Sequence, residues 1–156
     1  MARLLVVHHS PTATVQRLTE AVVAGTHDEE IEGVDVVVRS ALEANADDVL
    51  AANGILLGTT ANFGYMSGAL KHFFDTIFLQ AGGALSNDGG GAAATSATLP
   101  FGLWVHGRYD TTGAVRSVLS IVQALPWKQS APTLEVLGDI DDGELAAGYE
   151  LGGTLA

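Results

Sequence analysis

Short runs of hydrophobic residues recur along the chain, and segments with helical spacing separate them. Five such runs are predicted strands, and they cover residues 3–7, 34–38, 55–58, 101–105 and 133–137. The runs do not alternate between apolar and polar positions, which is typical of strands that are buried on both faces of a parallel sheet.

Each predicted strand is followed by a segment that favours a helix. From Thr12 onward, Val15, Leu18, Val22 and Val23 recur at helical spacing until Gly25 closes the segment, and residues 47–52 form a short helix. A third helix follows the third strand and has one oily face: Met66, Leu70, Phe73, Phe74, Ile77 and Phe78. Residues 113–125 and the segment from residue 142 to the C-terminus are the last two helices, and Pro126 stops the former.

This order of elements, strand then helix five times, predicts one α/β domain over residues 1–156. The expected architecture has three layers, with a doubly wound five-stranded parallel sheet between helices. Residues 81–100 are rich in glycine and alanine without a clear period, and they are predicted to be a long loop. In such sheets ligands bind beyond the carboxyl ends of the strands, so the loops after strands one, three and four carry the functional prediction.

Composition and charge exclude several classes of function. The chain has no cysteine, and therefore no disulfide, zinc–thiolate site or thiol nucleophile. Its net charge of −11 argues against nucleic acid and anionic membranes as partners. No apolar run has the length of a membrane span or the form of a signal peptide, so we expect a cytoplasmic protein.

The loop after the first strand, HHSPTATVQ, places hydroxyl side chains at a helix start. Exposed backbone N–H groups and the helix dipole favour an anion there, and Ser10, Thr12 and Thr14 add donors without adding charge. The alternative is plain helix capping by Ser10 or Thr12. Neither G-x-G-x-x-G nor G-x-x-x-x-G-K-[ST] is present, which excludes dinucleotide and Walker-type loops.

The other two loops combine aromatic residues with glycine. In TTANFGYMSG, Phe63 and Tyr65 flank Gly64, and a flat aromatic ligand could pack against them; the alternative is a turn glycine with the aromatics in the core. In HGRYDTTGA, Tyr109 could cover a second ring face, and the alternative is helix capping by Asp110 or Thr111 with an exposed tyrosine. The three loops are expected at one rim of the sheet, formed by the carboxyl ends of its strands. Hydrogen-bond donors for an anion, next to two loops that carry aromatic residues, suit a phosphorylated planar cofactor.

The segment GTTANFGYMSGALKHFFDTIF closely resembles the flavodoxin-like proteins and the NADPH-dependent FMN reductases. In that family a loop of the type G-T/S-P-x-x-F/Y-G-x-M-S/G precedes the third helix, and SPTAT and HGRYDTTGA resemble its other two flavin loops. The resemblance implies a flavodoxin-like sheet with strand order 2-1-3-4-5 and FMN as cofactor. The implied contacts are Ser10, Thr12, Ala13, Thr14 and Val15 for the phosphate; Thr60, Ala61, Asn62, Phe63, Gly64 and Tyr65 for the flavin ring; and His106, Gly107, Arg108, Tyr109 and Asp110 for its other side.

Two functions follow from the resemblance. The first is an FMN-dependent NAD(P)H oxidoreductase that reduces a quinone, a flavin or a similar acceptor; the second is a flavodoxin-type electron carrier that serves a redox partner protein. The chain departs from many relatives at Thr60, where they carry proline, and a backbone carbonyl near Gly64 is a candidate acceptor for the N–H at N5 of reduced flavin. No residue is assigned as catalytic, and related quinone reductases imply a homodimer.

Three non-redox interpretations are weaker. Ser10 with His8, His9 or His106 as base would make a hydrolase, but the G-x-S-x-G elbow is missing. Adjacent histidines on a strand point to opposite faces, so His8 and His9 cannot chelate one metal together. A receiver-type signalling domain would need an acidic cluster where this chain has His8, His9 and Ser10.

Overall fold

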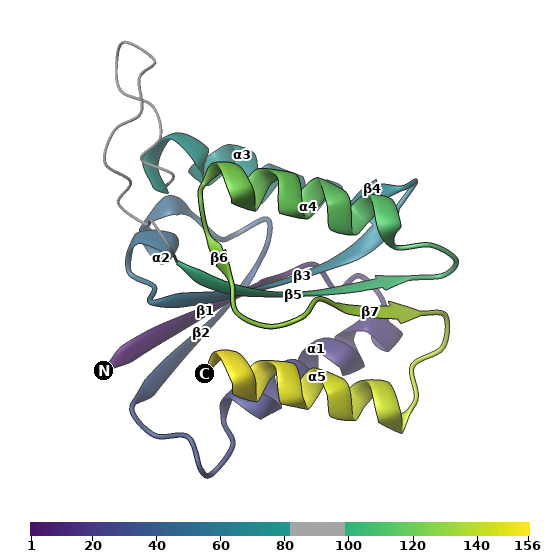
Figure 1. Ribbon diagram of the computed structural model, residues 1–156, viewed down its shortest axis with the longest axis horizontal. Coiled ribbons are helices and arrows are strands. Elements are labelled where there is room, and N and C mark those ends of the chain that lie inside the picture. The colour runs from purple at the N-terminus through teal and green to yellow at the C-terminus, as the bar shows by residue number, and fades with distance from the viewer. Residues whose placement is uncertain (82–98) are drawn as a thin grey trace.

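A parallel sheet lies between two helical layers in the computed structural model, which describes residues 1–81 and 99–156 (Figure 1). The upper layer holds α2, α3 and α4, and the lower layer holds α1 and α5. Most of the predicted loop at residues 81–100 lies outside the described residues.

The elements follow the predicted alternation closely. The strands are β1 (Ala2–His8), β2 (Val34–Ser40), β3 (Gly54–Asn62), β4 (Tyr65–Met66), β5 (Pro100–Gly107), β6 (Lys128–Gln129) and β7 (Leu134–Leu137). The helices are α1 (Ala13–Thr26), α2 (Ala46–Leu50), α3 (Gly68–Ala81), α4 (Thr112–Ala124) and α5 (Asp142–Leu155). Asn45 caps α2 in a capping box, and Asp141 caps α5 in the same way.

The sheet confirms the predicted class and refines the predicted strand order. Parallel pairing runs β2-β1-β3-β5, and both β6 and β7 then pair with β5. The predicted fifth strand is β7, which pairs with the second half of β5, whereas the unpredicted two-residue β6 pairs with its beginning. The strand order of the sheet is therefore β2-β1-β3-β5-β6, with β7 also paired to β5, whereas the predicted order is 2-1-3-4-5. The short strand β4 forms an antiparallel hairpin with β3.

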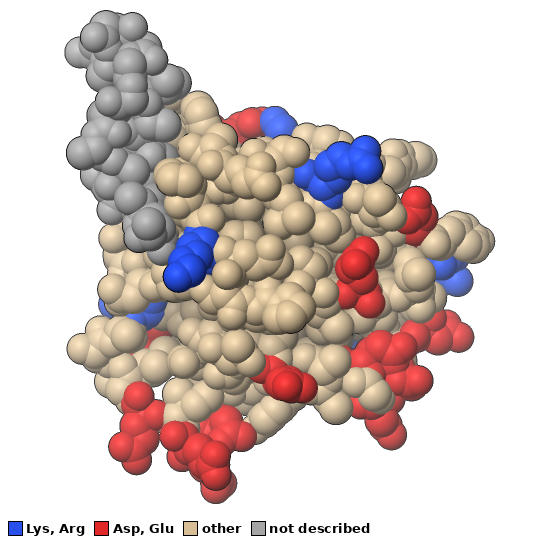
Figure 2. All heavy atoms as spheres, viewed as in Figure 1, with Lys and Arg blue, Asp and Glu red and all other residues tan. Residues whose placement is uncertain are grey.

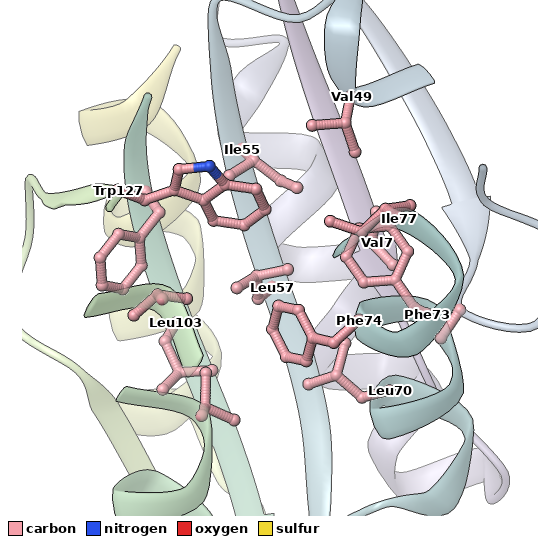
Figure 3. Packing of buried hydrophobic residues seen from close by; sticks show 14 of the residues in the cluster. Val7, Val49, Ile55, Leu57, Leu70, Phe73, Phe74, Ile77, Leu103 and Trp127 are labelled. Atoms are coloured by element: carbon pink, nitrogen blue, oxygen red, sulfur yellow. The ribbon is translucent and has the colours of Figure 1, made fainter. Parts of the chain in front are cut away.

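The larger core cluster lies between the sheet and the upper helices (Figure 3). Phe73, Phe74 and Ile77 of α3 are buried against Leu57 of β3, and Phe78 is partly buried beside them. The apolar face of α3 is therefore part of the core. Met66, which the sequence places on this face, is also buried in the core but belongs to β4.

In the lower layer, glycines allow α1 and α5 to cross at a very short distance. A Cβ built on Gly152 of α5 would lie 1.9 Å from the carbonyl oxygen of Val22 on α1, and one on Gly25 would lie 1.9 Å from the carbonyl oxygen of Tyr149. Only glycine allows backbones to approach so closely. Gly25 does not close α1 as predicted, because the helix continues to Thr26 and ends on His27.

The strand register brings the carboxyl ends of β1, β3 and β5 to one rim, at the right in Figure 1. His8 is level with Gly58, and Thr60 is level with His106. The His9 amide also donates to the Gly58 carbonyl over 3.0 Å. No helix within residues 1–81 and 99–156 is long and apolar enough to cross a bilayer.

Candidate functional site

The first loop leads directly into the start of α1. Thr12 is the N-cap, and its Oγ1 accepts from the amide of Val15 over 3.3 Å, as the capping alternative predicts. In the part of the chain that the structure describes, the amides of Ala13 and Thr14 have no acceptor, and both residues are exposed. Helix capping and an anion site are therefore compatible here, because the cap satisfies only one of the first amides. Val15 is buried, and its amide already donates to Thr12, so it offers no free donor to an anion.

Ser10 is tied into a side-chain network behind this loop. Its Oγ lies 2.9 Å from Nδ1 of His8 and 2.6 Å from Oγ1 of Thr19. Burial, helped by the charge of His9, lowers the pKa of His8 below its usual value. If His8 and Thr19 both donate to Ser10, the Ser10 proton is free for an anion at the helix start.

The Ser10–His8 contact is also the pair that a hydrolase would use. Within the described residues, no carboxylate bonds to the other ring nitrogen of His8, so the orienting third member of a triad is absent. Residues 1–81 and 99–156 also contain no group of three His, Asp or Glu side chains placed to hold a metal ion. The anion interpretation needs neither feature.

The second loop is a two-residue hairpin between β3 and β4. Asn62 pairs with Tyr65, and the turn residues Phe63 and Gly64 have φ values of 52° and 74°. Positive φ at both positions is the requirement of a type I′ turn, which glycine meets easily and phenylalanine rarely. The strained turn holds Phe63 fully in solvent, and Tyr65 is exposed as well. The alternative that placed these aromatics in the core is wrong.

The hairpin is seated on the first turn of α4. A Cβ built on Gly113 would lie 2.0 Å from the carbonyl oxygen of Gly64, and Ser117 Oγ accepts from the Met66 amide over 3.2 Å. The Gly64 carbonyl, one of the backbone carbonyls near Gly64 that could accept from flavin N5, is thus turned onto α4 in this structure. Gly113 is the residue that makes room for it.

The third loop joins β5 to α4 and presents Tyr109 to solvent. The Tyr109 side chain is 86% exposed, and Arg108 is exposed beside it. Asp110 accepts from both the amide and the hydroxyl of Thr112, at 3.0 and 2.8 Å, and these bonds lower the pKa of its carboxyl group. Asp110 thus bonds to the first amide of α4, while Thr111 stands at the N-cap position without a side-chain bond to the helix, and the exposed tyrosine leaves a ring available at the rim.

His106 and Thr111 connect this loop to β7. Nε2 of His106 lies 2.6 Å from the carbonyl oxygen of Gly138, and Thr111 donates to Oε1 of Glu135 over 2.6 Å. His106 therefore fixes the backbone around the rim through one ring nitrogen. Gly107 is buried, and a Cβ there would meet the Ala61 side chain at 3.1 Å, so the ends of β5 and β3, from which loops three and two leave, are in direct contact.

Thr60 carries an unsatisfied polar atom at the centre of the rim. The residue is 8% exposed, and Oγ1 has no hydrogen-bond partner among the described residues. The neighbouring hydroxyl of Thr59, by contrast, donates to a carbonyl and accepts from the Ser67 amide. A buried hydroxyl without a partner is costly and is a feature of sites that a ligand completes.

Acidic side chains border the rim on one side. Figure 2 shows them gathered at the lower right, over the segment that joins β7 to α5, where Asp139, Asp141 and Asp142 are exposed. This segment was not among the predicted site residues. Negative charge there disfavours further negative charge on a ligand at the rim.

All sixteen predicted contact residues therefore lie at one rim, in the three loops and in the ends of the strands and the helix that flank them, although they do not all present side chains. Sequence reasoning missed Thr19, Gly113, Glu135 and Gly138, which bond to or seat the loops from other elements. Gly113 near a predicted helix start was the one visible signal. The other three act through long-range contacts that no local pattern reveals.

Comparison with solved structures assigns the architecture. A flavodoxin from the domain Archaea superimposes with a TM-score of 0.76 at 18% identity, and the match covers 97% of this chain and 94% of that one. The chain has the flavodoxin-like fold. The predicted resemblance to flavodoxin-like proteins is confirmed.

Curated proteins also match this flavodoxin-like chain in sequence, and two of them are informative. A flavodoxin from Aquifex aeolicus is 32% identical over 77 residues, which are 49% of this chain and 40% of that protein. An NAD(P)H dehydrogenase (quinone) from Acidithiobacillus ferrooxidans is 30% identical over 133 residues, 72% of this chain and 62% of the relative. The chain therefore matches less than two thirds of the length of either relative. No protein-family model matches it.

Proposed function

We propose that this flavodoxin-like protein binds FMN and acts as an NAD(P)H-dependent oxidoreductase toward a quinone or a similar acceptor. The observation that carries the proposal is the arrangement of the rim. Free amides at the start of α1 lie at the same sheet edge as Phe63 and Tyr109, two aromatic side chains held in solvent. An anion site beside exposed aromatic rings fits a phosphorylated aromatic cofactor.

The first loop would hold the phosphate without a basic side chain. Ala13 and Thr14 would donate backbone N–H groups, and Ser10 would donate its hydroxyl while it accepts from His8 and Thr19. Neutral donors and a helix dipole suit a chain whose net charge of −11 opposes anions at long range. The Thr60 hydroxyl, unsatisfied in the protein alone, would gain a partner on the cofactor.

The second and third loops would orient the ring and limit its contact with water. Phe63, Tyr65 and Tyr109 supply aromatic surface, and the hairpin is fixed by Gly113 and Ser117 on α4. Bound FMN would supply the redox chemistry, taking a hydride from NAD(P)H and returning two electrons to the acceptor. The nearby carboxylates would disfavour the anionic reduced form and so make the protein a stronger reductant.

Steady-state oxidation of NADH and NADPH by the FMN-loaded protein tests the enzymatic part of this proposal. We expect oxidation that depends on an added quinone, with one nicotinamide consumed for each quinone reduced by two electrons. A protein that is loaded with FMN but oxidises neither nicotinamide would contradict the reductase assignment.

An electron carrier is the second candidate, and the similarity to the Aquifex aeolicus flavodoxin favours it. A carrier would use the same three loops and need no nicotinamide or quinone site of its own. It would be reduced only when a partner reductase is added to the assay, and this outcome separates the two functions.

A further inference from the structure

A groove lies between α1 and the edge strand β2, on the side of the first loop that faces away from β3. It has a volume of about 620 Å³ and is lined by His8, Ser10, Glu20, Val23, Ala24 and Val38, among others. This volume lies within the range of small-molecule sites. The groove shares the Ser10 hydroxyl with the proposed cofactor contacts, and it is also lined by His8 and Thr19, which bond to that hydroxyl.

The groove has a cause in the packing of the lower layer. Gly25 and Gly152 allow α1 and α5 to pack at backbone contact, and Gly148 makes room for the side chains of Leu18 and Val22 on α1. The edge strand β2 is left only partly covered, and none of its seven residues is fully buried. Val38 is consequently 37% exposed, with Val23 and Ala24 of α1 on the facing wall.

The polar groups of the groove are the Glu20 carboxylate, the His8 ring, the hydroxyls of Ser10 and Thr19 and the Gln16 amide, and no lysine or arginine among the described residues lines it. Glu20 is exposed and is the one ionised side chain among the lining residues. Nδ1 of His8 is engaged by Ser10, which leaves Nε2 as the ring nitrogen without a partner among the described residues. Burial holds the pKa of His8 below its usual value, so the ring is neutral at pH 7 and adds no positive charge.

We propose that this groove binds a small organic cation, a protonated amine with an apolar body. The amine would donate to the Glu20 carboxylate, and its apolar body would lie against Val23, Ala24 and Val38. The net charge of −11 adds a long-range attraction for cations over neutral or anionic molecules of the same shape. The assignment does not depend on flavin binding.

Three probes of one shape test it on the FMN-free protein: 1-naphthylmethylamine, 1-naphthalenemethanol and 1-naphthoate. Binding is measured by calorimetry and by NMR shifts. We expect the amine to bind most tightly, the alcohol more weakly and the carboxylate weakest, with shifts centred on Val23, Ala24 and Val38. Equal affinities for the three probes, or shifts elsewhere on the protein, would overturn the proposal.

Two variants test the contacts. Glu20→Gln is expected to weaken amine binding roughly twofold to fivefold, the range of an exposed ion pair, and to leave alcohol binding unchanged. Glu43→Gln removes the same charge from an exposed loop position and serves as the control. Amine affinity that is unchanged in Glu20→Gln, or reduced equally in both variants, would overturn the assignment of Glu20.

A third variant blocks the groove. Val38→Lys places a long cation in it and is expected to abolish binding of the amine, whereas Leu79→Lys adds the same charge at an exposed site on α3 and should preserve it. If Val38→Lys does not fold, Ala24→Lys provides the block from an exposed position of α1. Undiminished amine binding in a folded blocking variant would contradict the proposal.

Discussion

Replacing Gly113 with alanine tests whether the contact between α4 and the β3–β4 hairpin positions that hairpin for flavin binding. The added Cβ would lie 2.0 Å from the Gly64 carbonyl oxygen, and real Cβ atoms essentially never come within 3.0 Å of such a neighbour. The carbonyl must therefore retreat by about 1 Å, and the turn that holds Phe63 must move with it.

Gly113→Ala should change both the free energy of unfolding and the affinity for FMN. Overpacking typically costs about 1–3 kcal/mol, and alanine regains up to about 1 kcal/mol of helix propensity in α4. The free energy of unfolding should thus fall by roughly 0–2 kcal/mol, because the hairpin is exposed and can shift. Displacing ring contacts by about 1 Å is expected to weaken FMN binding at least about tenfold.

Fluorescence titration of FMN and urea unfolding of the FMN-free protein measure these effects separately. Gly68→Ala is the matched control, because a Cβ at the first residue of α3 has no atom within 4 Å. It should leave the FMN affinity unchanged. If Gly113→Ala folds and binds FMN like the control, the hairpin does not position the cofactor, and the assignment of the second loop is wrong.

Three further predictions concern single side chains. Thr60→Val removes the unsatisfied hydroxyl, so the FMN-free protein should gain about 1 kcal/mol in urea unfolding while FMN binding weakens about threefold to tenfold; a loss of stability would show that the hydroxyl already has a partner. Tyr109→Ala should weaken FMN binding about twofold to twelvefold without a change in stability, since an aromatic pair contributes about 0.5–1.5 kcal/mol and the side chain is exposed, and Leu79→Ala is its control. The lowered pKa of His8 means that, below pH 6.5, the unfolded chain takes up this proton before the folded protein does, so unfolding free energy should decrease on acidification through the window between 6.5 and the lower folded pKa. His8→Gln should reduce this pH dependence, and an unchanged slope between pH 7.5 and 5.5 would refute the assignment to His8.

The predictable part of this fold was the part that local hydrophobic pattern determines. Buried strands such as β1 and β3 read as continuous apolar runs, and Pro126 marked the end of α4 correctly. The two-residue strands β4 and β6 carry no periodicity, so they were missed. Glycine disfavours helices, so the sequence predicts a helix end at Gly25, but the contact of Gly25 with α5 outweighs that propensity.

The candidate site was predictable as a set of loops but not as a set of contacts. Parallel strands bring their carboxyl ends to one rim, so the positions of the three loops followed from the order of elements alone. The inward carbonyl of Gly64, the bond from His106 to Gly138 and the unsatisfied hydroxyl of Thr60 depend on elements distant in sequence. The single domain, the homodimer and the cytoplasmic location stay predictions.

Titration of FMN with the FMN-free protein tests the central claim most directly. The account predicts saturable quenching of flavin fluorescence at one FMN per chain, with a Kd of about 1 μM or tighter. Riboflavin should bind more weakly, because it lacks the phosphate that the start of α1 would hold. Absence of saturable quenching by a folded protein would mean that the three loops only cap helices and close turns, and both redox functions would have to be withdrawn while the fold stands.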